Sequence, residues 1–385
     1  MLVIYIAAGI TLSGIQLILP ALPAVRTALG LTEAQVGLVT LVYLVAAFLL
    51  GIPAGILADR IGRRRLTIAA LVLFGVAGLW TAVTTDLTWF LIARALQGAC
   101  FGAIQPTTIA LVADATQGKE QVKGQARRYL GVATGDAALP IVGAAVLVWL
   151  GWRSVFGLQA VTLLVALVFA RLVPERTTAV RDSEGDGYVV RLVTSLRTRG
   201  VLVLALAGVV RFLLKFGFLT YLPILAAGLG DDGRVAALAL GLGSAGGALT
   251  GVVLARYVDR VASSVVLRAS FAIGSATLIA VAWSPDLFVL AVAAVAFGTA
   301  DGVVAVFQNA FLPVVSDART RSGVIASVGS LRNLGKALGP GAVAVGLLFL
   351  ELPAAMTVLA VIGGLMSLLL APLAAYDAKV GRARG

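Results

Sequence analysis

Residues 35–85 read QVGLVTLVYLVAAFLLGIPAGILADRIGRRRLTIAALVLFGVAGLWTAVTT. Two apolar runs, 35–58 and 66–85, flank a short loop that is crowded with arginine. Each run has the ~20 residues that a helix needs to cross the roughly 30 Å hydrocarbon core of a bilayer, since a helix rises about 1.5 Å per residue. The stretch therefore predicts two membrane-spanning helices joined by a basic loop.

The same pattern recurs along the whole chain. Apolar runs of spanning length lie near residues 2–24, 35–58, 66–85, 87–113, 127–150, 154–173, 201–226, 235–257, 265–284, 287–315, 323–350 and 353–375. Hydrophobic residues make up 60% of the 385 residues and charged residues only 12%, whereas soluble domains have about 45–50% and roughly 25%. We therefore predict an all-α integral membrane protein with twelve transmembrane helices.

The positions of lysine and arginine predict the topology. If both termini are cytoplasmic, nearly all basic residues between the runs fall on the cytoplasmic side, and the exceptions are Arg26, Arg153 and Arg234. This asymmetry follows the positive-inside rule. It accounts for the net charge of +12 without a nucleic-acid partner, because no basic face continues along one element. We expect a multi-pass protein of the cytoplasmic membrane.

Residue types that are missing exclude several chemistries. The chain has no histidine and one cysteine, Cys100. This excludes a Ser-His-Asp triad, a histidine metal ligand and a cysteine metal cluster. We expect no metal, no cofactor and no enzymatic activity.

The sequence divides into two similar halves. The long polar segment 174–199 separates a predicted six-helix bundle, 1–173, from a second one, 200–385, and is expected to be a cytoplasmic linker. Three pairs of matching segments relate the halves: R-x-L-G-x-x-x-G from Arg128 and from Arg332, Val112-Ala113-Asp114 and Val315-Ser316-Asp317, and Asp59-Arg60 and Asp259-Arg260. A duplicated six-helix unit explains these matches and predicts two pseudo-symmetric bundles.

Small residues four apart predict close helix crossings. Such pairs are Gly51/Gly55, Gly98/Gly102, Gly243/Gly247 and Gly247/Gly251.

The loop at 55–65, Gly55-Ile-Leu-Ala-Asp59-Arg60-Ile-Gly62-Arg63-Arg64-Arg65, resembles the G-x-L-a-D-R-x-G-R-[RK] loop of the major facilitator superfamily. Glycine permits close helix approach at Gly55 and a tight turn at Gly62. In the family this loop latches the two bundles in the outward-open state. The resemblance implies a conformational latch made of Gly55, Asp59, Arg60, Gly62, Arg63 and Arg64, with Asp114 as partner of the arginines. Alternatively, the arginines only hold the loop in the cytoplasm.

The segment Arg94-Ala-Leu-Gln97-Gly98 resembles the R-x-x-q-G motif of the same superfamily. An arginine within a span costs about 3 kcal/mol on insertion scales, so it needs a partner or a watery cavity. In the family this arginine faces the central cavity and is tied to proton coupling. The alternative is a structural ion pair.

The segment Gly131-x-x-x-Gly135 resembles the start of the family's antiporter motif, but Asp136 stands where that motif has proline. A carboxylate near mid-membrane is costly to keep charged, so it can exchange a proton. The alternative is an ion pair between Asp136 and Arg94 with no role in transport. Trp152-Arg153 with Phe156 resembles the W-R-x-x-F of drug-efflux-type members. The chain is thus similar to the drug/proton antiporters of the twelve-helix type, which implies the major facilitator fold.

Further charges lie inside predicted spans. Arg211 and Lys215 share one helix face, as do Arg332 and Lys336, because each pair is four residues apart. Like charges on one face in lipid are tolerated where they meet water, acids or an anionic ligand. We expect a substrate cavity lined by Arg94, Gln97, Arg211, Lys215, Arg332 and Lys336. Alternatively, Arg332 extends its charged end to the cytoplasmic edge of the membrane.

These features predict a proton-coupled secondary transporter that works by alternating access. Asp136 or Asp301 would carry the proton, and Arg94 would tune its proton affinity. The expected partners are a small amphiphilic or drug-like substrate, protons and the lipid bilayer, and we expect a monomer. The alternatives are an organic-anion transporter or a lipid flippase with a basic central cavity, and a non-transporting membrane receptor or scaffold.

Overall fold

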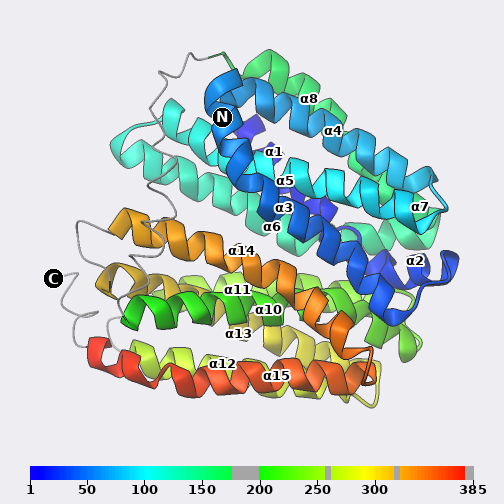
Figure 1. The fold of residues 1–385 in the computed structure, drawn as a ribbon, viewed down its shortest axis with the longest axis vertical. Helices are drawn as coiled ribbons and strands as arrows, with labels where there is room; N and C mark the ends of the chain where they lie inside the picture. Colours follow the sequence, from blue (N-terminus) through cyan, green and yellow to red (C-terminus); the bar gives the residue numbers. More distant parts are fainter. Residues whose placement is uncertain (176–198, 256–261, 316–320, 378–385) are drawn as a thin grey trace. The chain divides into compact units, whose positions relative to one another are not determined.

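The computed structural model describes residues 1–175, 199–255, 262–315 and 321–377, and every element in these ranges is helical (Figure 1). The expected all-α fold is confirmed. Within these ranges, eleven helical segments are long and apolar enough to cross a membrane. The remaining predicted span, 323–350, corresponds to helix α14 (Arg321–Gly346), whose polar residues include Arg332 and Lys336.

Contacts divide the chain into two compact units. The first contains the helices α1 (Leu2–Ile10), α2 (Leu22–Ala28), α3 (Glu33–Ile61), α4 (Arg63–Val83), α5 (Leu87–Ala115), α6 (Gly118–Leu150), α7 (Trp152–Gly157) and α8 (Val161–Leu172), together with Asp231–Gly241. The second contains α10 (Arg199–Gly228), the rest of α11 (Arg234–Ala255), α12 (Ser263–Ala282), α13 (Leu287–Val315), α14 and α15 (Leu352–Leu369).

Several expectations lie outside the described residues. They concern most of the linker, residues 176–198, and the second copies of two repeated segments, Asp259-Arg260 and Asp317.

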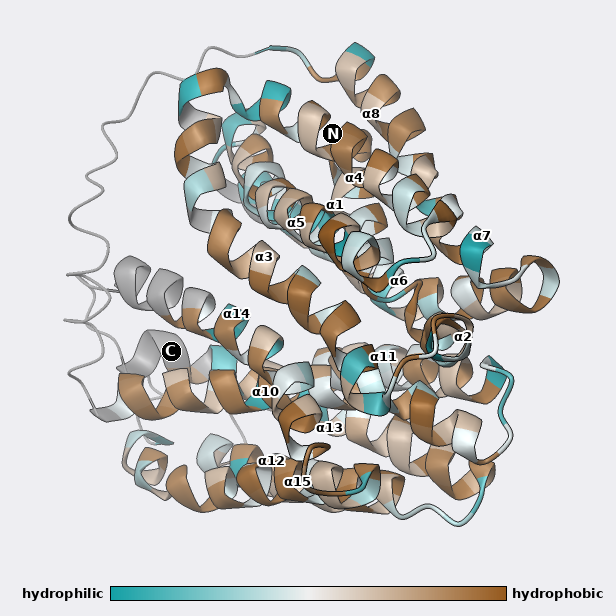
Figure 2. Ribbon diagram, turned by 45° about the vertical axis from the view of Figure 1, so that its right-hand side comes forward, coloured by the Kyte–Doolittle hydropathy of each residue, from teal (hydrophilic) through white to brown (hydrophobic). Residues whose placement is uncertain are grey.

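Large apolar side chains on the outer faces of the helices indicate a lipid environment. Trp149 is 83% exposed, Phe288 is 77% exposed and Leu2 is 70% exposed. Figure 2 shows hydrophobic residues along nearly the full length of the helices in both units. A water-soluble protein rarely exposes continuous apolar surface of this extent, so these faces suit hydrocarbon.

The same glycine-mediated helix crossing occurs in each unit. In the first, Gly98 and Gly102 of α5 pack against the main chain of α3 at Tyr43 and Ala47. A Cβ atom added to Gly102 would lie 3.0 Å from the Cα atom of Ala47. In the second, the glycine pairs of α13 and α11 meet at a crossing of the same kind, where a Cβ on Gly247 would lie 2.7 Å from the carbonyl oxygen of Gly298. The crossings predicted from Gly98/Gly102 and Gly243/Gly247 are confirmed.

The repeated segment R-x-L-G-x-x-x-G makes a second crossing of the same kind. A Cβ on Gly131 of α6 would lie 2.9 Å from the carbonyl oxygen of Tyr5, and a Cβ on Gly135 would lie 2.9 Å from that of Gly9. In the second unit, Gly335 and Gly339 of α14 face the main chain of α10 in the same way. The repeat therefore preserves the glycines that let the first and fifth spans of each half touch.

The first span is not the continuous helix that the apolar run 2–24 predicts. Helix α1 ends at Ile10, and two short 3₁₀ turns, Thr11–Gly14 and Leu19–Ala21, precede α2. Proline has no N–H group to donate and clashes with a helical neighbour, and Pro20 lies inside this segment. Gly14 fits close beneath the side chains of Tyr43 and Phe74. Because residues 11–22 are all buried, the main-chain groups freed by the break need partners from the protein.

Candidate functional site

Arg94 of α5 supplies a hydrogen-bond partner for the main-chain groups that the break in the first span leaves free. Its side chain is fully buried. Nη2 donates to the carbonyl oxygen of Gly14 at 2.6 Å, Nε to that of Val39 at 3.3 Å, and Nη1 to Oε1 of Gln97 at 2.7 Å. The guanidinium also lies 4.5 Å from the centre of the Tyr43 ring, which attracts a cation. Arg94 is thus held by main-chain oxygens and a ring, and the alternative of an ion pair with Asp136 is wrong for this conformation.

Two glutamines continue this polar network inside the first unit. Nε2 of Gln97 donates to Oε1 of Gln159 and, at 3.4 Å, to the carbonyl oxygen of Phe74. Nε2 of Gln159 in turn donates to the carbonyl oxygen of Ser13 at 3.0 Å. Main-chain groups in a bilayer must be satisfied internally, and Gln159 and Arg94 do this for the consecutive carbonyls at the break. In this conformation Arg94 and Gln97 are buried, and their place in a substrate cavity stays a prediction.

Asp136 of α6 has a different environment from the other carboxylate within a span. Its Oδ1 atom accepts a hydrogen bond of 2.8 Å from Nε2 of Gln16, which belongs to the broken part of the first span. Gln16 is only 4% exposed, while Asp136 is partly exposed. No ion pair joins Asp136 to a cation in the described part of the chain.

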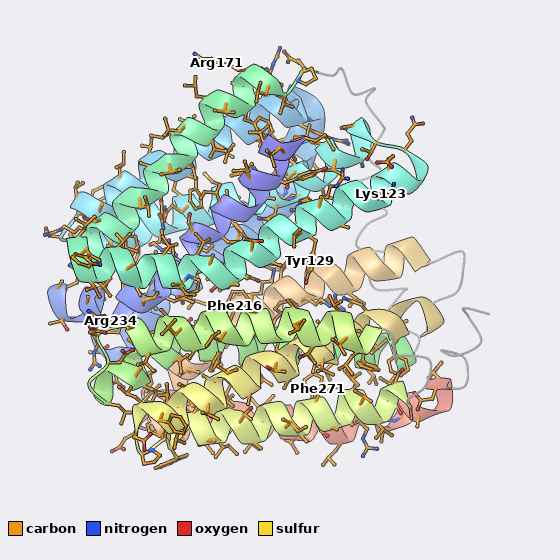
Figure 3. The ribbon with its side chains drawn as sticks, turned by 180° about the vertical axis from the view of Figure 1, so that it is seen from behind. Lys123, Tyr129, Arg171, Phe216, Arg234 and Phe271 are labelled. Carbon is orange, nitrogen blue, oxygen red and sulfur yellow. The ribbon has the colours of Figure 1, made fainter. Side chains whose placement is uncertain are left out.

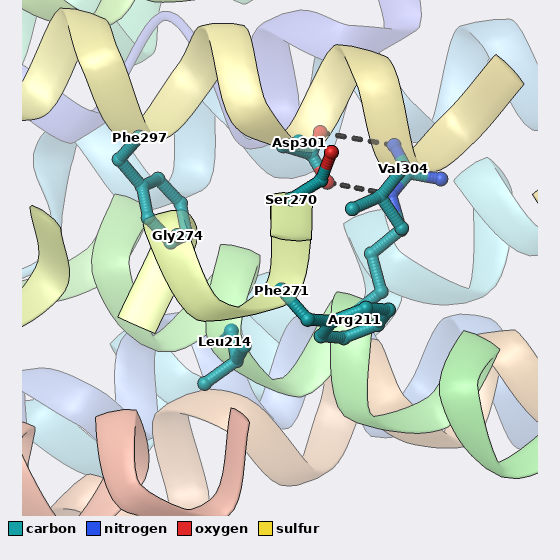
Figure 4. Close-up of a pocket in the computed structure, with 8 residues that line it drawn as sticks. All are labelled: Arg211, Leu214, Ser270, Phe271, Gly274, Phe297, Asp301 and Val304. Carbon is teal, nitrogen blue, oxygen red and sulfur yellow. Dashed lines mark hydrogen bonds and ion pairs between the residues drawn. The ribbon is translucent and has the colours of Figure 1, made fainter. Parts of the chain in front are cut away.

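Asp301 of α13 instead lies between two cations, Arg211 and Lys215, of which Arg211 is drawn in Figure 4. Oδ1 accepts from Nε of Arg211 at 2.5 Å and Oδ2 from its Nη2 at 2.9 Å, while Nζ of Lys215 lies 3.2 Å from Oδ2. The Arg211 and Asp301 side chains are 11% and 9% exposed. A two-pronged arginine–carboxylate pair is among the stronger hydrogen-bonded contacts in proteins. The structure thus joins a predicted proton carrier to two predicted substrate-binding residues.

A pocket borders this ion pair within the second unit. Helices α10, α12 and α13 line it with Arg211, Ser270, Phe271, Phe297 and Asp301 among other residues (Figure 4). Phe271 is buried in the unit and is also labelled in Figure 3. The cavity volume of the pocket is about 20 Å³, which is room for about one water molecule. Drug-sized ligands occupy pockets of ~300–1,000 Å³, so this pocket alone is too small for such a substrate.

Arg332 of α14 lacks partners that its counterpart Arg128 has. Nε of Arg128 donates to Oγ1 of Thr108 at 3.0 Å, and Nη2 donates to Oε1 of Gln105 at 2.6 Å. Arg332 donates from Nη1 to Oδ1 of Asn309 at 3.1 Å. Its Nε and Nη2 atoms are buried and have no hydrogen-bond partner within the described ranges. The two repeated arginines therefore differ, and Arg332 retains donors that an anion could use.

Lys336 lies one helical turn beyond Arg332, with its Nζ atom 5.1 Å from the centre of the Phe212 ring. It contributes a second positive charge to this helix face.

The loop at 55–65 has the predicted turn. Gly62 ends α3 and precedes α4 with φ of 96°, a conformation that glycine adopts most easily. The expected close approach at Gly55 is wrong for this conformation, since a Cβ there would have open space around it. The Arg60 side chain is exposed, and the Asp59 side chain lies outside the described part of the structure.

The arginines after this turn bind two helix ends of the first unit. Nη1 of Arg63 lies 2.7 Å from both carboxylate oxygens of Asp114 at the end of α5. Arg64 donates to the carbonyl oxygens of Val173, at 2.6 Å, and of Ala170 at the end of α8. These last carbonyls of a helix have no partner within it, and arginine supplies one. Asp114 is thus paired with an arginine of the loop.

The aromatic residues of W-R-x-x-F form a cluster with α5. The rings of Trp152 and Phe156 meet edge to face with centres 6.0 Å apart, and Phe90 lies 5.4 Å from Phe156. This segment fixes the turn between α6 and α8.

Sequence reasoning missed three residues of the first unit: Gln16, Tyr43 and Gln159. All three are buried in apolar stretches. They carry no charge at neutral pH, so the cost of a buried charge, which pointed to Arg94 and Asp136, gives no signal for them. A polar amide within a span was the one available indication.

The family model for the Major Facilitator Superfamily matches residues 4–340. The chain belongs to the Major Facilitator Superfamily. Members of this superfamily are transporters and not enzymes, in agreement with the prediction from residue types.

Relatives within the Major Facilitator Superfamily are named for different kinds of transport. The probable 4-methylmuconolactone transporter of Cupriavidus pinatubonensis is 31% identical over 211 residues, which are 53% of this chain and 49% of that protein. The multidrug resistance protein MdtL of Shewanella sp. (strain ANA-3) is 32% identical over 154 residues, 39% of this chain and 38% of that protein. The chain thus spans about half the length, or less, of the curated relatives it matches.

A solved structure confirms the major facilitator fold. The crystal structure of a bacterial homologue of the human lysosomal transporter Spinster, in an inward-facing and occupied conformation, superposes with a TM-score of 0.76. The match covers 99% of this chain and 96% of that chain at 18% sequence identity, so the likeness concerns the fold alone.

Proposed function

We propose that this chain is a proton-coupled secondary transporter that moves a small amphiphilic or drug-like molecule across the cytoplasmic membrane. It has both termini in the cytoplasm, acts as a monomer, and uses alternating access, in which the six-helix bundles 1–173 and 200–385 move relative to each other. The membership of the Major Facilitator Superfamily and the multidrug resistance protein among its relatives support this choice.

One observation supports the choice of the residue that would couple transport to protons. Of the two carboxylates in question, Asp301 is the counter-ion of Arg211 and Lys215, whereas Asp136 is held by the neutral amide of Gln16. A proton arriving at Asp301 would have to displace two cations. At Asp136 it competes with a single neutral hydrogen bond, so Asp136 is our choice for the proton carrier.

The test is flux in proteoliposomes under an imposed pH gradient, with ethidium as the amphiphilic probe. We expect Asp136→Asn to abolish the gradient-driven component, because an amide cannot exchange the proton. The matched control is Glu120→Gln, which removes an exposed carboxylate of the same helix, one that pairs with Lys123. It should transport like the unmodified protein.

Unchanged pH dependence in Asp136→Asn would remove Asp136 as the carrier. If the unmodified protein moves neither ethidium nor an aromatic carboxylate but moves a fluorescent lipid between leaflets, the flippase alternative holds. Absence of all three activities favours a receptor or scaffold.

We also propose a conformational latch in the loop at 55–65, comprising Gly55, Asp59, Arg60, Gly62, Arg63 and Arg64. The contact between Arg63 and Asp114 supports it, as do the bonds from Arg64 to the end of α8. These contacts bring the start of α4 together with two neighbouring helix ends, so they can stabilise one conformation over another.

The unpartnered nitrogens of Arg332 favour a second candidate, transport of an organic anion. In the part of the chain that the structure describes, two buried donors of Arg332 have no acceptor, and Lys336 lies on the same helix face. Benzoate and benzamide are similar in shape and differ in charge, so a larger thermal shift with benzoate supports this candidate. We expect Arg332→Gln to remove that preference and Arg127→Gln, an exposed change on α6, to keep it. Equal shifts with both ligands contradict it.

A further inference from the structure

Gln16 links the irregular part of the first span to the proposed proton carrier. It follows the 3₁₀ turn Thr11–Gly14 by two residues and is 4% exposed. Its Nε2 atom donates to Oδ1 of Asp136 at 2.8 Å, across 120 residues of sequence. Its second polar atom, Oε1, is buried and has no hydrogen-bond partner among the described residues. An unpartnered buried acceptor costs free energy, so its presence beside a titratable group needs an explanation.

The backbone on both sides of this hydrogen bond is closely packed. A Cβ on Gly135, the residue before Asp136, would lie 2.9 Å from the carbonyl oxygen of Gly9. Gly143, two turns later on α6, faces the carbonyl oxygen of Leu17, the residue after Gln16. Contact at both glycines holds α6 against the first span above and below Asp136. The distance between Gln16 and Asp136 is therefore set by the backbone.

The charged groups around α6 make no hydrogen bond or ion pair with Asp136 in the described part of the chain. The elements packed on α6 within this unit are α1, α5, α7, the two 3₁₀ turns of the first span, and the segment Asp231–Gly241, whose last residue faces the carbonyl oxygen of Ala137. Their titratable side chains in the described part are Tyr5, Arg94, Cys100, Asp114, Arg153, Asp231, Asp232 and Arg234, and those of α6 itself include Glu120, Lys123, Arg127, Arg128 and Tyr129. No hydrogen bond or ion pair joins any of them to Asp136: Arg94 binds Gly14, Arg128 binds Gln105, and Arg153 lies over Trp152. Gln16 is the group that contacts the carboxylate directly.

We propose that Gln16 is a positioning residue that sets the proton affinity of Asp136. A glutamine amide has a donor end and an acceptor end. The donor end binds the carboxylate, as in this structure. When Asp136 takes up a proton, rotation of the amide brings Oε1 to accept from the new O–H group. The residue thus satisfies both protonation states, and it favours the carboxylate because a hydrogen bond to a charged group is the stronger of the two. The inference rests on the proposed role of Asp136 as proton carrier.

The experiment is a pH titration followed by infrared spectroscopy of the protein in lipid, which reads protonation without any transport. The carboxyl C=O band that disappears in Asp136→Asn belongs to Asp136. In Gln16→Met, which keeps the length of the side chain and removes its amide, we expect the midpoint of that band to move upward by about one pH unit. The band should also shift in frequency in the protonated state, because it loses the bond to Oε1.

A matched control uses a glutamine of α6 itself. Nε2 of Gln125 donates to the carbonyl oxygen of Ile109 at 2.9 Å and does not touch Asp136, so Gln125→Met should leave the midpoint and frequency unchanged. If Gln16→Met does not fold, Gln16→Glu retains the shape and puts a second carboxyl group beside Asp136. Two carboxyl groups at this distance share one proton, so the Asp136 titration should then split into two steps.

An unchanged Asp136 band in Gln16→Met, or a single unshifted step in Gln16→Glu, overturns the inference. So does a band that never titrates in the unmodified protein. These results are independent of flux: if Asp136 titrates with the expected shifts while Asp136→Asn retains pH-driven transport, the role of Gln16 holds and the proposed function of Asp136 fails.

Discussion

Nη2 of Arg94 and the carbonyl oxygen of Gly14 lie 2.6 Å apart, although 80 residues separate them in the sequence. The arginine supplies the hydrogen bond that a regular helix would have supplied to this carbonyl. Because the contact is fully buried, Arg94 has a structural task in the first span whatever its role in proton coupling.

We therefore expect Arg94→Met to lower the stability of the folded protein as well as transport. Each main-chain oxygen left without a donor costs about 1–3 kcal/mol, so a clear drop in melting temperature should be measurable in detergent. Arg153→Ala, which removes an exposed arginine lying over Trp152, should change the melting temperature little. A stable Arg94→Met protein that only loses pH-dependent transport would contradict the structural task.

The ion pair in the second unit makes a prediction about charge balance. Asp301→Asn leaves Arg211 and Lys215 without their carboxylate, and loss of one partner from a buried pair costs about 3–5 kcal/mol. The double variant Asp301→Asn with Arg211→Gln removes one of the two cations that have lost this carboxylate, so it should recover part of the stability. Thermal unfolding in detergent measures both effects.

The exposed pair Arg26–Glu33 is the control for this experiment, with side chains 39% and 34% exposed. Glu33→Gln should have a small effect, since surface pairs contribute about 0–1 kcal/mol. A double variant that is less stable than Asp301→Asn alone would contradict the prediction, because Arg211 would then stabilise the unit even without its carboxylate.

The crossing of α3 and α5 should be intolerant of even one methyl group. In Gly98→Ala the new Cβ would meet the Tyr43 main chain, where its Cα atom lies 2.9 Å away, so the helices must separate. We expect a loss of about 1–3 kcal/mol, seen as less monodisperse protein on size-exclusion chromatography. The matched control is Gly364→Ala on α15, where an added Cβ would have no atom of the described residues within contact distance. It should be neutral or stabilising by up to ~1 kcal/mol.

The contact between Arg63 and Asp114 should affect conformation more than stability. Their side chains are 24% and 26% exposed, so we expect Asp114→Asn to change the melting temperature little. If the pair belongs to a latch, the variant should shift the accessibility of cysteines introduced on one side of the membrane and slow transport. The exchange Arg63→Asp with Asp114→Arg should restore part of the activity. Equal accessibility in Asp114→Asn and the unmodified protein argues for a role in topology alone.

Much of the fold follows from the sequence because hydrocarbon imposes a fixed length on each span. The apolar runs, the duplicated R-x-L-G-x-x-x-G and the pairs Gly98/Gly102 and Gly243/Gly247 each correspond to an element or crossing of the structure. The break in the first span was not foreseen, since residues 11–24 carry no charge and are mostly apolar. Hydropathy measures side chains and carries little information about where main-chain hydrogen bonds end.

The candidate site was predictable in part. The cost of burying a charge singled out Arg94, Asp136, Arg211 and Asp301. Their partners could not be predicted in the same way, because i,i+4 spacing describes neighbours on one helix and says nothing of the facing helix. Arg211 and Lys215 share a face as expected, and the carboxylate they bind comes from α13, 86 residues or more along the chain. Gln16 and Gln159 carry no charge and were missed.

The break in the first span also constrains how the sequence of this protein can change during evolution. The buried main-chain carbonyls of Ser13 and Gly14 depend on donors encoded far downstream, so neither partner is free to vary alone. A substitution that shortened Arg94 or Gln159 would have to be accompanied by another donor, or by replacements at Gly14 and Pro20 that rewind the segment into ordinary helix. Among homologues, we expect the break in the first span and its two donor side chains, Arg94 and Gln159, to be inherited together or lost together.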